Sequence, residues 1–252
     1  MKKSVIFTCL ILIAFGCKDK TEKAMDKMAE ETMKANGTEK EASSEWVMLF
    51  DGTSFDGWKE YGADGVSENW KIEDGAMVFY PPSERQNGVS HNLVTENEFT
   101  DFVISLEWKI SEAGNSGIMW GVAEDAKYDQ PYMTGPEIQV LDNDKHPDGK
   151  NGTSHQAGAL YDMVSPSDDV TKPVGEWNTM LLTINNDKKQ GNVVLNGTEV
   201  VSFPVGNELW NEMVAKSKFA DWEGFGKFVT GKLALQDHGD MVAYRNIKIK
   251  EL

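Results

Sequence analysis

Short runs of alternating apolar and polar residues, separated by Gly, Asn, Asp and Pro, fill the chain from Trp46 to the C-terminus. In FVISLEWKI, residues 102–110, every second side chain is apolar on one face, while Ser105, Glu107 and Lys109 fall on the other. This period of two is typical of a half-buried strand. NWKIEDGAMVFY, residues 69–80, predicts a hairpin that turns at Asp74 and Gly75. Many such strands predict an all-β, antiparallel β-sandwich.

The same pattern predicts further strands and one short helix around residues 207–218. The strands are expected at 117–122, 136–141, 178–185, 190–195, 198–203, 232–237 and 242–250. The intervening stretches 123–135, 143–157 and 162–176 are longer than ordinary hairpin loops. Long loops in a compact sandwich usually line a site, so we expect the functional residues there.

The N-terminal 44 residues have a different sequence pattern from the alternating runs that follow. Lys2 and Lys3 precede an apolar run over residues 5–15, which is too short to span a membrane and indicates an export signal. The string AFGC resembles the lipobox of bacterial lipoproteins, which implies cleavage before Cys17 and its acylation; secretion without an anchor is the alternative. We therefore predict a signal peptide at 1–16, an acylated cysteine and flexible tether at 17–44, and one domain at 45–252. The expected location is the cell envelope, lipid-anchored and facing the periplasm or the exterior.

Composition narrows the class of partner. The 252 residues are 40% hydrophobic, enough for one sizeable core, and carry a formal net charge of −16. No cluster of Lys and Arg interleaves with aromatic residues, so phosphate backbones would be repelled and nucleic acid is not an expected partner. The only cysteines are Cys9 and Cys17. Since Cys9 lies in the signal, the mature fold has no internal disulfide.

The segment GPEIQVLDNDKHPDG, residues 135–149, combines a short apolar strand with several acids. Alternation places Glu137 and Gln139 on one face and Ile138 and Val140 on the other. Asp142 is out of phase with them unless the strand bulges. A retaining glycosidase needs two carboxyl groups about 5–5.5 Å apart, and Gln139 cannot ionise, so ordinary retaining hydrolysis is not favoured.

Three of the four histidines lie in polar, loop-like segments: His146 in DKHPDG, His155 in TSHQAGALYD and His238 in LQDHGD. An imidazole beside carboxylates can act as a general base near neutral pH or bind a divalent metal ion. All three are therefore candidate metal ligands. The alternative for each is a loop histidine hydrogen-bonded to a neighbouring acid.

Other residues suit sugar binding. Arg245 shares a strand face with Ile247 and Ile249, so we expect it to point inward, where it would need a core carboxylate or a ligand oxygen. Asn115 lies among small residues in AGNSGIMWG, which allow close approach of a sugar. Trp120 and Tyr161 could stack on a sugar ring, although most tryptophans of a sandwich belong to its core.

Taken in order, the segments LFDGTSFDGW, GNSGI, TGPEIQVLDNDKHPDGK, AGALYD, GEWN and LQDHGDMVAYRNIKI resemble the 3-keto-disaccharide hydrolase family over residues 46–252. The resemblance implies a concanavalin-A-like jelly roll. It also implies cleavage of small glycosides already oxidised at C3, by hydrolysis or by elimination across C1–C2 followed by hydration.

A ketone at C3 makes the C2 proton acidic, so a base can remove it if the enolate oxygen is stabilised. The base would be Glu137 or a histidine, and Arg245, His238 or a divalent cation would polarise the oxygen. A non-catalytic sugar-binding jelly roll is the alternative function. The candidate catalytic residues are Glu137, His146, His155, Asp237, His238 and Arg245; the candidate substrate-binding residues are Asn115, Gln139, Asp142, Tyr161, Asp162 and Trp120.

Overall fold

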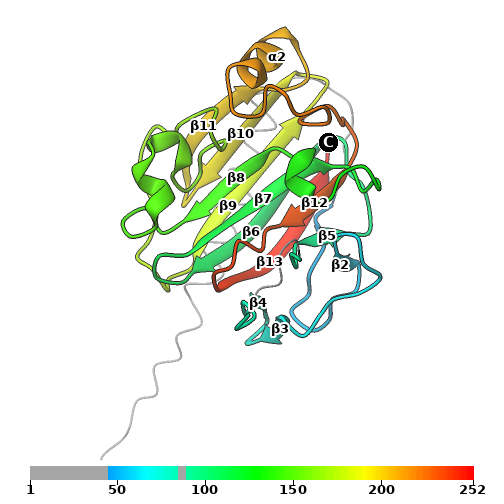
Figure 1. Cartoon of the computed structure of the whole chain (residues 1–252), viewed down its shortest axis with the longest axis vertical. Coiled ribbons are helices and arrows are strands. Elements are labelled where there is room, and N and C mark those ends of the chain that lie inside the picture. Colours follow the sequence, from blue (N-terminus) through cyan, green and yellow to red (C-terminus); the bar gives the residue numbers. More distant parts are fainter. Residues whose placement is uncertain (1–44, 85–88) are drawn as a thin grey trace, which may run out of the picture. The chain divides into compact units, whose positions relative to one another are not determined.

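The computed structural model describes residues 45–84 and 89–252. These residues form two antiparallel β-sheets packed as a sandwich, which confirms the all-β jelly-roll prediction (Figure 1). The proposed signal peptide, Cys17 and tether lie outside the described residues. No helix in the described part of the chain is long and apolar enough to cross a membrane.

The larger sheet has eight strands in the order β11-β10-β9-β6-β13-β4-β3, with β1 paired to β13. The strands are β1 (Val47–Met48), β3 (Trp70–Glu73), β4 (Ala76–Phe79), β6 (Phe102–Ile110), β9 (Asn178–Asn185), β10 (Gln190–Leu195), β11 (Thr198–Pro204) and β13 (Val242–Glu251).

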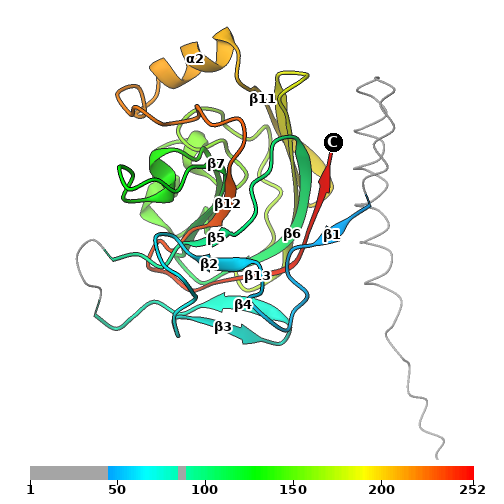
Figure 2. The ribbon, with the colours of Figure 1, turned by 90° about the vertical axis from the view of Figure 1, so that its right-hand side faces the viewer.

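The smaller sheet has five strands in the order β2-β5-β12-β7-β8. They are β2 (Trp58–Glu60), β5 (Leu93–Thr95), β12 (Lys232–Leu235), β7 (Asn115–Val122) and β8 (Glu137–Leu141). The loops around β8 contain three short 3₁₀ helices, which are η1 (Pro131–Met133), η2 (Pro147–Lys150) and η3 (Thr153–His155). The helix α2 (Glu208–Ala215), capped by the Asn207 side chain, lies at the β11 end of the sandwich (Figure 2).

The core lies between the inner faces of the two sheets. Ile104, Leu106 and Trp108 of β6 face Ile138 of β8 across it, and all four side chains are almost fully buried. Burial of such a side chain stabilises the fold by about 1.5–3 kcal/mol. The outer face of each sheet is therefore free to carry polar or functional groups.

Strand β13 contains a bulge that overturns one prediction. Its register with β6 shifts between Arg245 and Lys248, and Asn246 has a φ of +53°. Val242 and Tyr244 face the core before the bulge, and Ile247 faces it after the bulge. Arg245 therefore points to the outer face, and the expectation that it is directed inward with Ile247 is wrong.

The segment after η3 closes the free edge of β8. The amide of Tyr161 donates to the carbonyl of Glu137 at 3.0 Å, and the amide of Gln139 donates to the carbonyl of Ala159 at 3.1 Å. This pairing brings the loops with η2 and η3 next to β8. The polar side chains of these loops are thereby held beside Glu137.

Candidate active site

Glu137 lies on the outer face of the five-stranded sheet. Gln139 shares its face while Ile138 and Val140 enter the core, as the alternation predicts. The carboxylate accepts a hydrogen bond at 3.1 Å from Nε2 of Gln236, which follows β12. Glu137 is 9% exposed. The edge strand β8 thus presents a buried carboxyl group on the outer face of the sheet.

A glycine on the neighbouring strand makes room for this carboxyl group. Gly117 of β7 pairs with Gln139, next to Glu137. A Cβ atom placed on Gly117 would lie 2.1 Å from Oε1 of Glu137, closer than any real contact. The Glu137 side chain can lie across β7 only because residue 117 has no side chain.

Burial raises the pKa of Glu137 from 4.5 to about 8. The ammonium group of Lys218 and the hydrogen bond from Gln236 act in the opposite sense, and the Asp148 carboxylate adds to the rise. Burial in low dielectric disfavours a charge, so the neutral form persists to an unusually high pH. A carboxyl group with a pKa in this range is suited to proton transfer near neutral pH.

Three amide side chains around Glu137 have unused hydrogen-bonding capacity. The buried side-chain oxygens of Asn115, Gln139 and Gln236 have no hydrogen-bond partner among the described residues. Asn115 and Gln139 lie on the same sheet face as Glu137, and Gln236 is bonded to it. Buried polar atoms rarely remain unpaired in folded proteins, and their concentration on this face is typical of a site that binds hydroxyl groups.

A chain of hydrogen bonds lies beside Glu137. His155 Nδ1 contacts Asp148 Oδ1 at 2.9 Å, and His155 Nε2 contacts Asp162 Oδ1 at 3.3 Å. The Tyr161 hydroxyl donates to Asp148 Oδ2 at 2.8 Å. Burial and the Asp148 carboxylate raise the pKa of Tyr161, so it remains a phenol. The structure brings together three predicted site residues, His155, Tyr161 and Asp162, through Asp148.

Lys218 supplies a positive charge to this site. Its Nζ lies 4.0 Å from the centre of the Tyr161 ring, and its backbone amide donates to Asp162 Oδ2 at 2.8 Å. Lys218 follows α2, which is remote from β8 in sequence. A solvent-facing lysine beside a buried carboxyl group can stabilise negative charge that develops on a bound substrate.

His146, His238 and Asp240 form a candidate metal cluster, because one ligand atom of each lies within 4.8 Å of the others. His146 and His238 were predicted metal ligands, and the structure brings them together. His155 is not part of this cluster, and both of its ring nitrogens contact carboxylate oxygens. Nδ1 of His146 accepts a hydrogen bond from the Asp148 amide at 3.1 Å, with which a metal ion at that atom would compete.

Two predicted site acids are engaged by the backbone. Asp142 accepts hydrogen bonds from the amides of Ala113, Asp144 and Lys145 at 2.7–3.2 Å. No bulge interrupts the pairing of β7 and β8, so Asp142 organises the loop after β8 rather than joining the face of Glu137. Asp237 accepts from the amides of His91 and Gly239, both at 2.9 Å.

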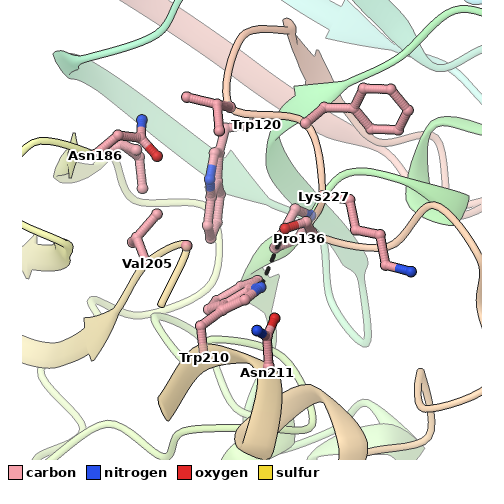
Figure 3. Close-up of a pocket in the computed structure, with 12 residues that line it drawn as sticks. Trp120, Pro136, Asn186, Val205, Trp210, Asn211 and Lys227 are labelled. Carbon is pink, nitrogen blue, oxygen red and sulfur yellow. Dashed lines mark hydrogen bonds between the residues drawn. The ribbon is translucent and has the colours of Figure 1, made fainter. Parts of the chain in front are cut away.

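The side chains of Arg245 and Trp120 do not lie on the sheet face that carries Glu137. Arg245 donates to Glu107 at 2.7 Å on the outer face of the other sheet. Trp120 points into the core, where its ring lies 5.6 Å from Phe203 and 6.5 Å from Trp210. It lines a separate cavity of about 280 Å³ beside α2, where Trp210 Nε1 donates to the Gly226 carbonyl (Figure 3).

The sequence interpretation missed five residues of this site. Gln236 and Asp240 lie in LQDHGD, Asp148 lies in DKHPDG and Gly117 lies in GNSGI, so each was inside a recognised motif. Lys218 had no such signal, because its position depends on how the chain folds after α2.

Comparison with known proteins agrees with this geometry. A family model for the 3-keto-alpha-glucoside-1,2-lyase-like domain matches residues 45–250. A 3-keto-disaccharide hydrolase from Bacteroides thetaiotaomicron is 36% identical over 231 residues, covering 82% of this chain and 78% of that protein. The solved structure of a candidate glycosyl hydrolase from Parabacteroides distasonis has a TM-score of 0.74 and 34% identity, over 88% of this chain and 97% of that chain.

A second structure of a candidate glycosyl hydrolase from Parabacteroides distasonis has a TM-score of 0.61 at 24% identity, covering 82% of this chain and 100% of that chain, and shows the shared fold alone. The sandwich and its buried carboxyl site define a jelly-roll protein of the glycoside-cleaving class. The chain belongs to the 3-keto-alpha-glucoside-1,2-lyase-like family. The resemblance stated from its sequence motifs is thereby confirmed.

Proposed function

We propose that this protein is an enzyme that cleaves 3-keto-glycosides, with Glu137 as the general base. The observation that carries the proposal is a buried carboxyl group with a pKa of about 8, surrounded by buried amide oxygens that have no partner among the described residues. Family membership supports the substrate class, since the Bacteroides thetaiotaomicron relative is named for 3-keto-disaccharides.

The proposed reaction begins with removal of the C2 proton by ionised Glu137. The C2–H electron pair forms an enolate with the C3 ketone. Collapse of the enolate forms the C1–C2 double bond and breaks the C1–oxygen bond, and the leaving oxygen takes up a proton to become an alcohol. Addition of water across the double bond then gives the free 3-keto sugar, so the sum is hydrolysis. No carboxylate nucleophile is needed, which is consistent with Gln139 on β8.

Lys218 is the residue that we propose to stabilise the enolate. Its ammonium group lies over Tyr161 and lowers the pKa of Glu137, so it acts electrostatically on the site. A fixed positive charge aimed at a developing oxyanion lowers the barrier more than it stabilises the neutral ketone. Asn115, Gln139 and Gln236 would bind the sugar hydroxyls through their free oxygens.

The cluster of His146, His238 and Asp240 offers a second way to polarise an oxygen. Asp240 accepts a hydrogen bond from the backbone N–H of Asn115 at 3.1 Å, which connects the cluster to the sugar-binding face. A divalent ion held there would act as a Lewis acid. Loss of activity in a chelator that added divalent ions restore, mirrored by His238→Ala, would assign polarisation to this cluster. Full activity in the chelator would leave the role to Lys218.

The decisive experiment incubates the purified protein with a 3-keto-glucoside and with its unoxidised parent. We expect cleavage of the 3-keto-glucoside alone, because without the ketone the C2 proton is far too weakly acidic. In deuterated water, elimination also predicts exchange at C2, which direct displacement at C1 does not. Rapid cleavage of the parent glycoside would refute the proposal.

A non-catalytic sugar-binding module is the second candidate. It would explain the unpaired amide oxygens but not the raised pKa of Glu137 or the adjacent Lys218. Binding of a 3-keto-glucoside without any turnover, under conditions where Glu137 is ionised, would favour it.

We also propose that the protein is anchored in the cell envelope through acylated Cys17. The support is the lipobox-like AFGC after a short apolar run. Several acyl chains bind a bilayer durably, whereas one does not. Cys17→Ser should move the protein out of the membrane fraction, and unchanged membrane association in that variant would refute the anchor.

A further inference from the structure

A second cavity lies on the outer face of the eight-stranded sheet. It has a volume of about 610 Å³. Its floor consists of Ala76 and Val78 of β4 and Ala243 of β13, which form an apolar cluster separate from the main core. Their neighbours Met77 and Tyr244 point into the core, so these three side chains point away from it. We call this cavity the outer-face trough.

The floor of the trough is unusual for the outer face of a sheet. Ala243 pairs with Val78 on one side and Lys109 on the other, so two small apolar side chains occupy positions where long polar ones are common. Alanine is disfavoured in strands, and here it leaves space above the sheet. A volume of this size falls within the range of small-ligand sites.

Two aromatic side chains wall the trough. Tyr80 and Trp177 both pack against the floor. The Tyr80 hydroxyl donates to Glu73 at 2.7 Å, and Lys71 Nζ lies 5.1 Å from the centre of its ring. The Arg245 guanidinium lies 4.0 Å from the centre of the Trp177 ring. These contacts hold both rings in place, which reduces the side-chain entropy that the protein would lose when a ligand binds.

The charges of the trough favour a neutral ligand. The ionisable side chains that line it are Glu73, Asp74, Lys109, Glu112 and Arg245. Arg245 is already paired with Glu107 through two nitrogens, each at 2.7 Å. The cavity therefore has no surplus of positive charge with which to bind an anion, and the chain as a whole is strongly acidic.

We propose that the outer-face trough is a second carbohydrate site, which binds the ring of a neutral, unoxidised sugar. Tyr80 supplies aromatic surface for the apolar face of a pyranose. Ser111 and Lys109, whose Nζ lies 4.7 Å from the centre of the Trp177 ring, supply hydrogen-bond donors for its hydroxyl groups. The trough and Glu137 lie on opposite outer faces of the sandwich, with the core between them. A sugar bound in the trough is therefore remote from the proposed chemistry, and this inference does not depend on that reaction.

The test titrates the purified protein with maltose, a neutral disaccharide, and with glucuronic acid, an anionic sugar. Binding is followed by calorimetry and ligand-observed NMR. We expect maltose to bind and glucuronic acid to bind more weakly. Trp177→Ala removes a wall and Ala243→Leu fills the floor, so each should lower the maltose affinity by about tenfold. Ser202→Leu, on the exposed face of β11 in the same sheet, is the matched control and should bind normally.

A second arm shows where the maltose sits. In Glu137→Gln saturated with 3-keto-glucoside, maltose affinity should be unchanged, because the two sites are separate. Cleavage of the 3-keto-glucoside should also be unchanged in Ala243→Leu. The proposal is overturned by absence of maltose binding, by undiminished affinity in both trough variants, or by competition between maltose and the 3-keto-glucoside. Thermal melts confirm that each variant is folded.

Discussion

Glu137 and Glu107 lie on opposite outer faces of the sandwich, and their carboxyl groups have opposite surroundings. On the five-stranded sheet, Glu137 is deeply buried, and its carboxyl group accepts a hydrogen bond from the neutral side-chain amide of Gln236. On the eight-stranded sheet, Glu107 accepts from Arg245 and from the side chain of Asn246 at 2.8 Å. One carboxyl group lies beside amide groups whose oxygens have no partner among the described residues, and the other lies in a satisfied network.

This difference in hydrogen bonding distinguishes a carboxyl group that serves the proposed reaction from one that stabilises the fold. A buried, poorly compensated polar group costs free energy, so its retention indicates a use outside the folded chain itself. A paired charge on a partly exposed face contributes modestly to stability. We expect substitutions on the first face to affect activity and those on the second to affect stability.

The largest effect is expected from Glu137→Gln. The change is nearly isosteric but removes the base, so kcat/KM for a 3-keto-glucoside should fall by about 10²–10⁴-fold. Exchange of the C2 hydrogen with deuterated solvent should be lost with it. Glu107→Gln is the control on the other face and should retain wild-type kcat/KM. Full activity in Glu137→Gln would show that Glu137, like Glu107, is not required for catalysis.

The same Glu137→Gln variant should be more stable than the wild type at neutral pH. The unfolded chain ionises Glu137 near pH 4.5, whereas the folded chain retains the proton until about pH 8. The wild-type free energy of unfolding therefore falls as pH rises between these values. Urea unfolding at several pH values should show a gap between the two proteins that grows from pH 4.5 to 8. A constant gap would mean that Glu137 ionises normally.

Gly117→Ala tests whether the close approach of β7 and Glu137 matters. The new Cβ atom displaces the Glu137 carboxyl group, which it would otherwise overlap. Misplacement of a reacting group by about 1 Å can cost about 10²-fold in rate, so kcat should fall by this order. Gly65→Ala is the matched control, because a Cβ atom there meets nothing within 4 Å. Equal activity of the two variants would show that Glu137 tolerates another position.

Lys218→Met should have a smaller effect with a distinctive pH signature. Loss of the ammonium group raises the pKa of Glu137 further, so the acid limb of the kcat/KM profile should move to higher pH. We expect kcat itself to fall by about tenfold if Lys218 stabilises the enolate. Lys216→Met, two residues earlier and 79% exposed, should change neither quantity. A fall in kcat without a shift of the acid limb of the pH profile would show that Lys218 does not act through the pKa of Glu137.

The smallest effect is expected for Glu107→Gln, measured as stability. Loss of the charged pair with Arg245 should lower the free energy of unfolding by about 1 kcal/mol, reduced further by salt. Thermal unfolding at low and high ionic strength measures this directly. A loss of activity comparable to that of Glu137→Gln would contradict the assigned division of roles.

The two-residue periodicity of the sequence was sufficient to predict the longer strands of both sheets. Strands β6 and β8 follow their alternation, and the hairpin turns at Asp74 and Gly75 as predicted. Strands β1, β2 and β5 were not anticipated, because two or three residues are too few to show a period. The motifs around β8 were recognisable since their residues are contiguous in the chain.

The failures have local and long-range causes. Arg245 was assigned to the wrong face because a bulge inverts the phase without changing the pattern of residue types. Asp142 was given to the substrate although its carboxylate binds nearby backbone amides. Lys218 was missed because only the folded chain places it over Tyr161.

The bulge at Asn246 reverses the alternation of β13. Even-numbered residues face the core before it, and odd-numbered residues face the core after it. Deleting Asn246 would force one half of β13 to turn over, exchanging Tyr244 with Arg245 or Ile249 with Lys248 between core and solvent. Tyr244 bonds across the core to Ser116 at 2.7 Å, next to the glycine that accommodates Glu137. Among related proteins, we therefore expect insertions and deletions in β13 to be rarer than substitutions at most of its positions.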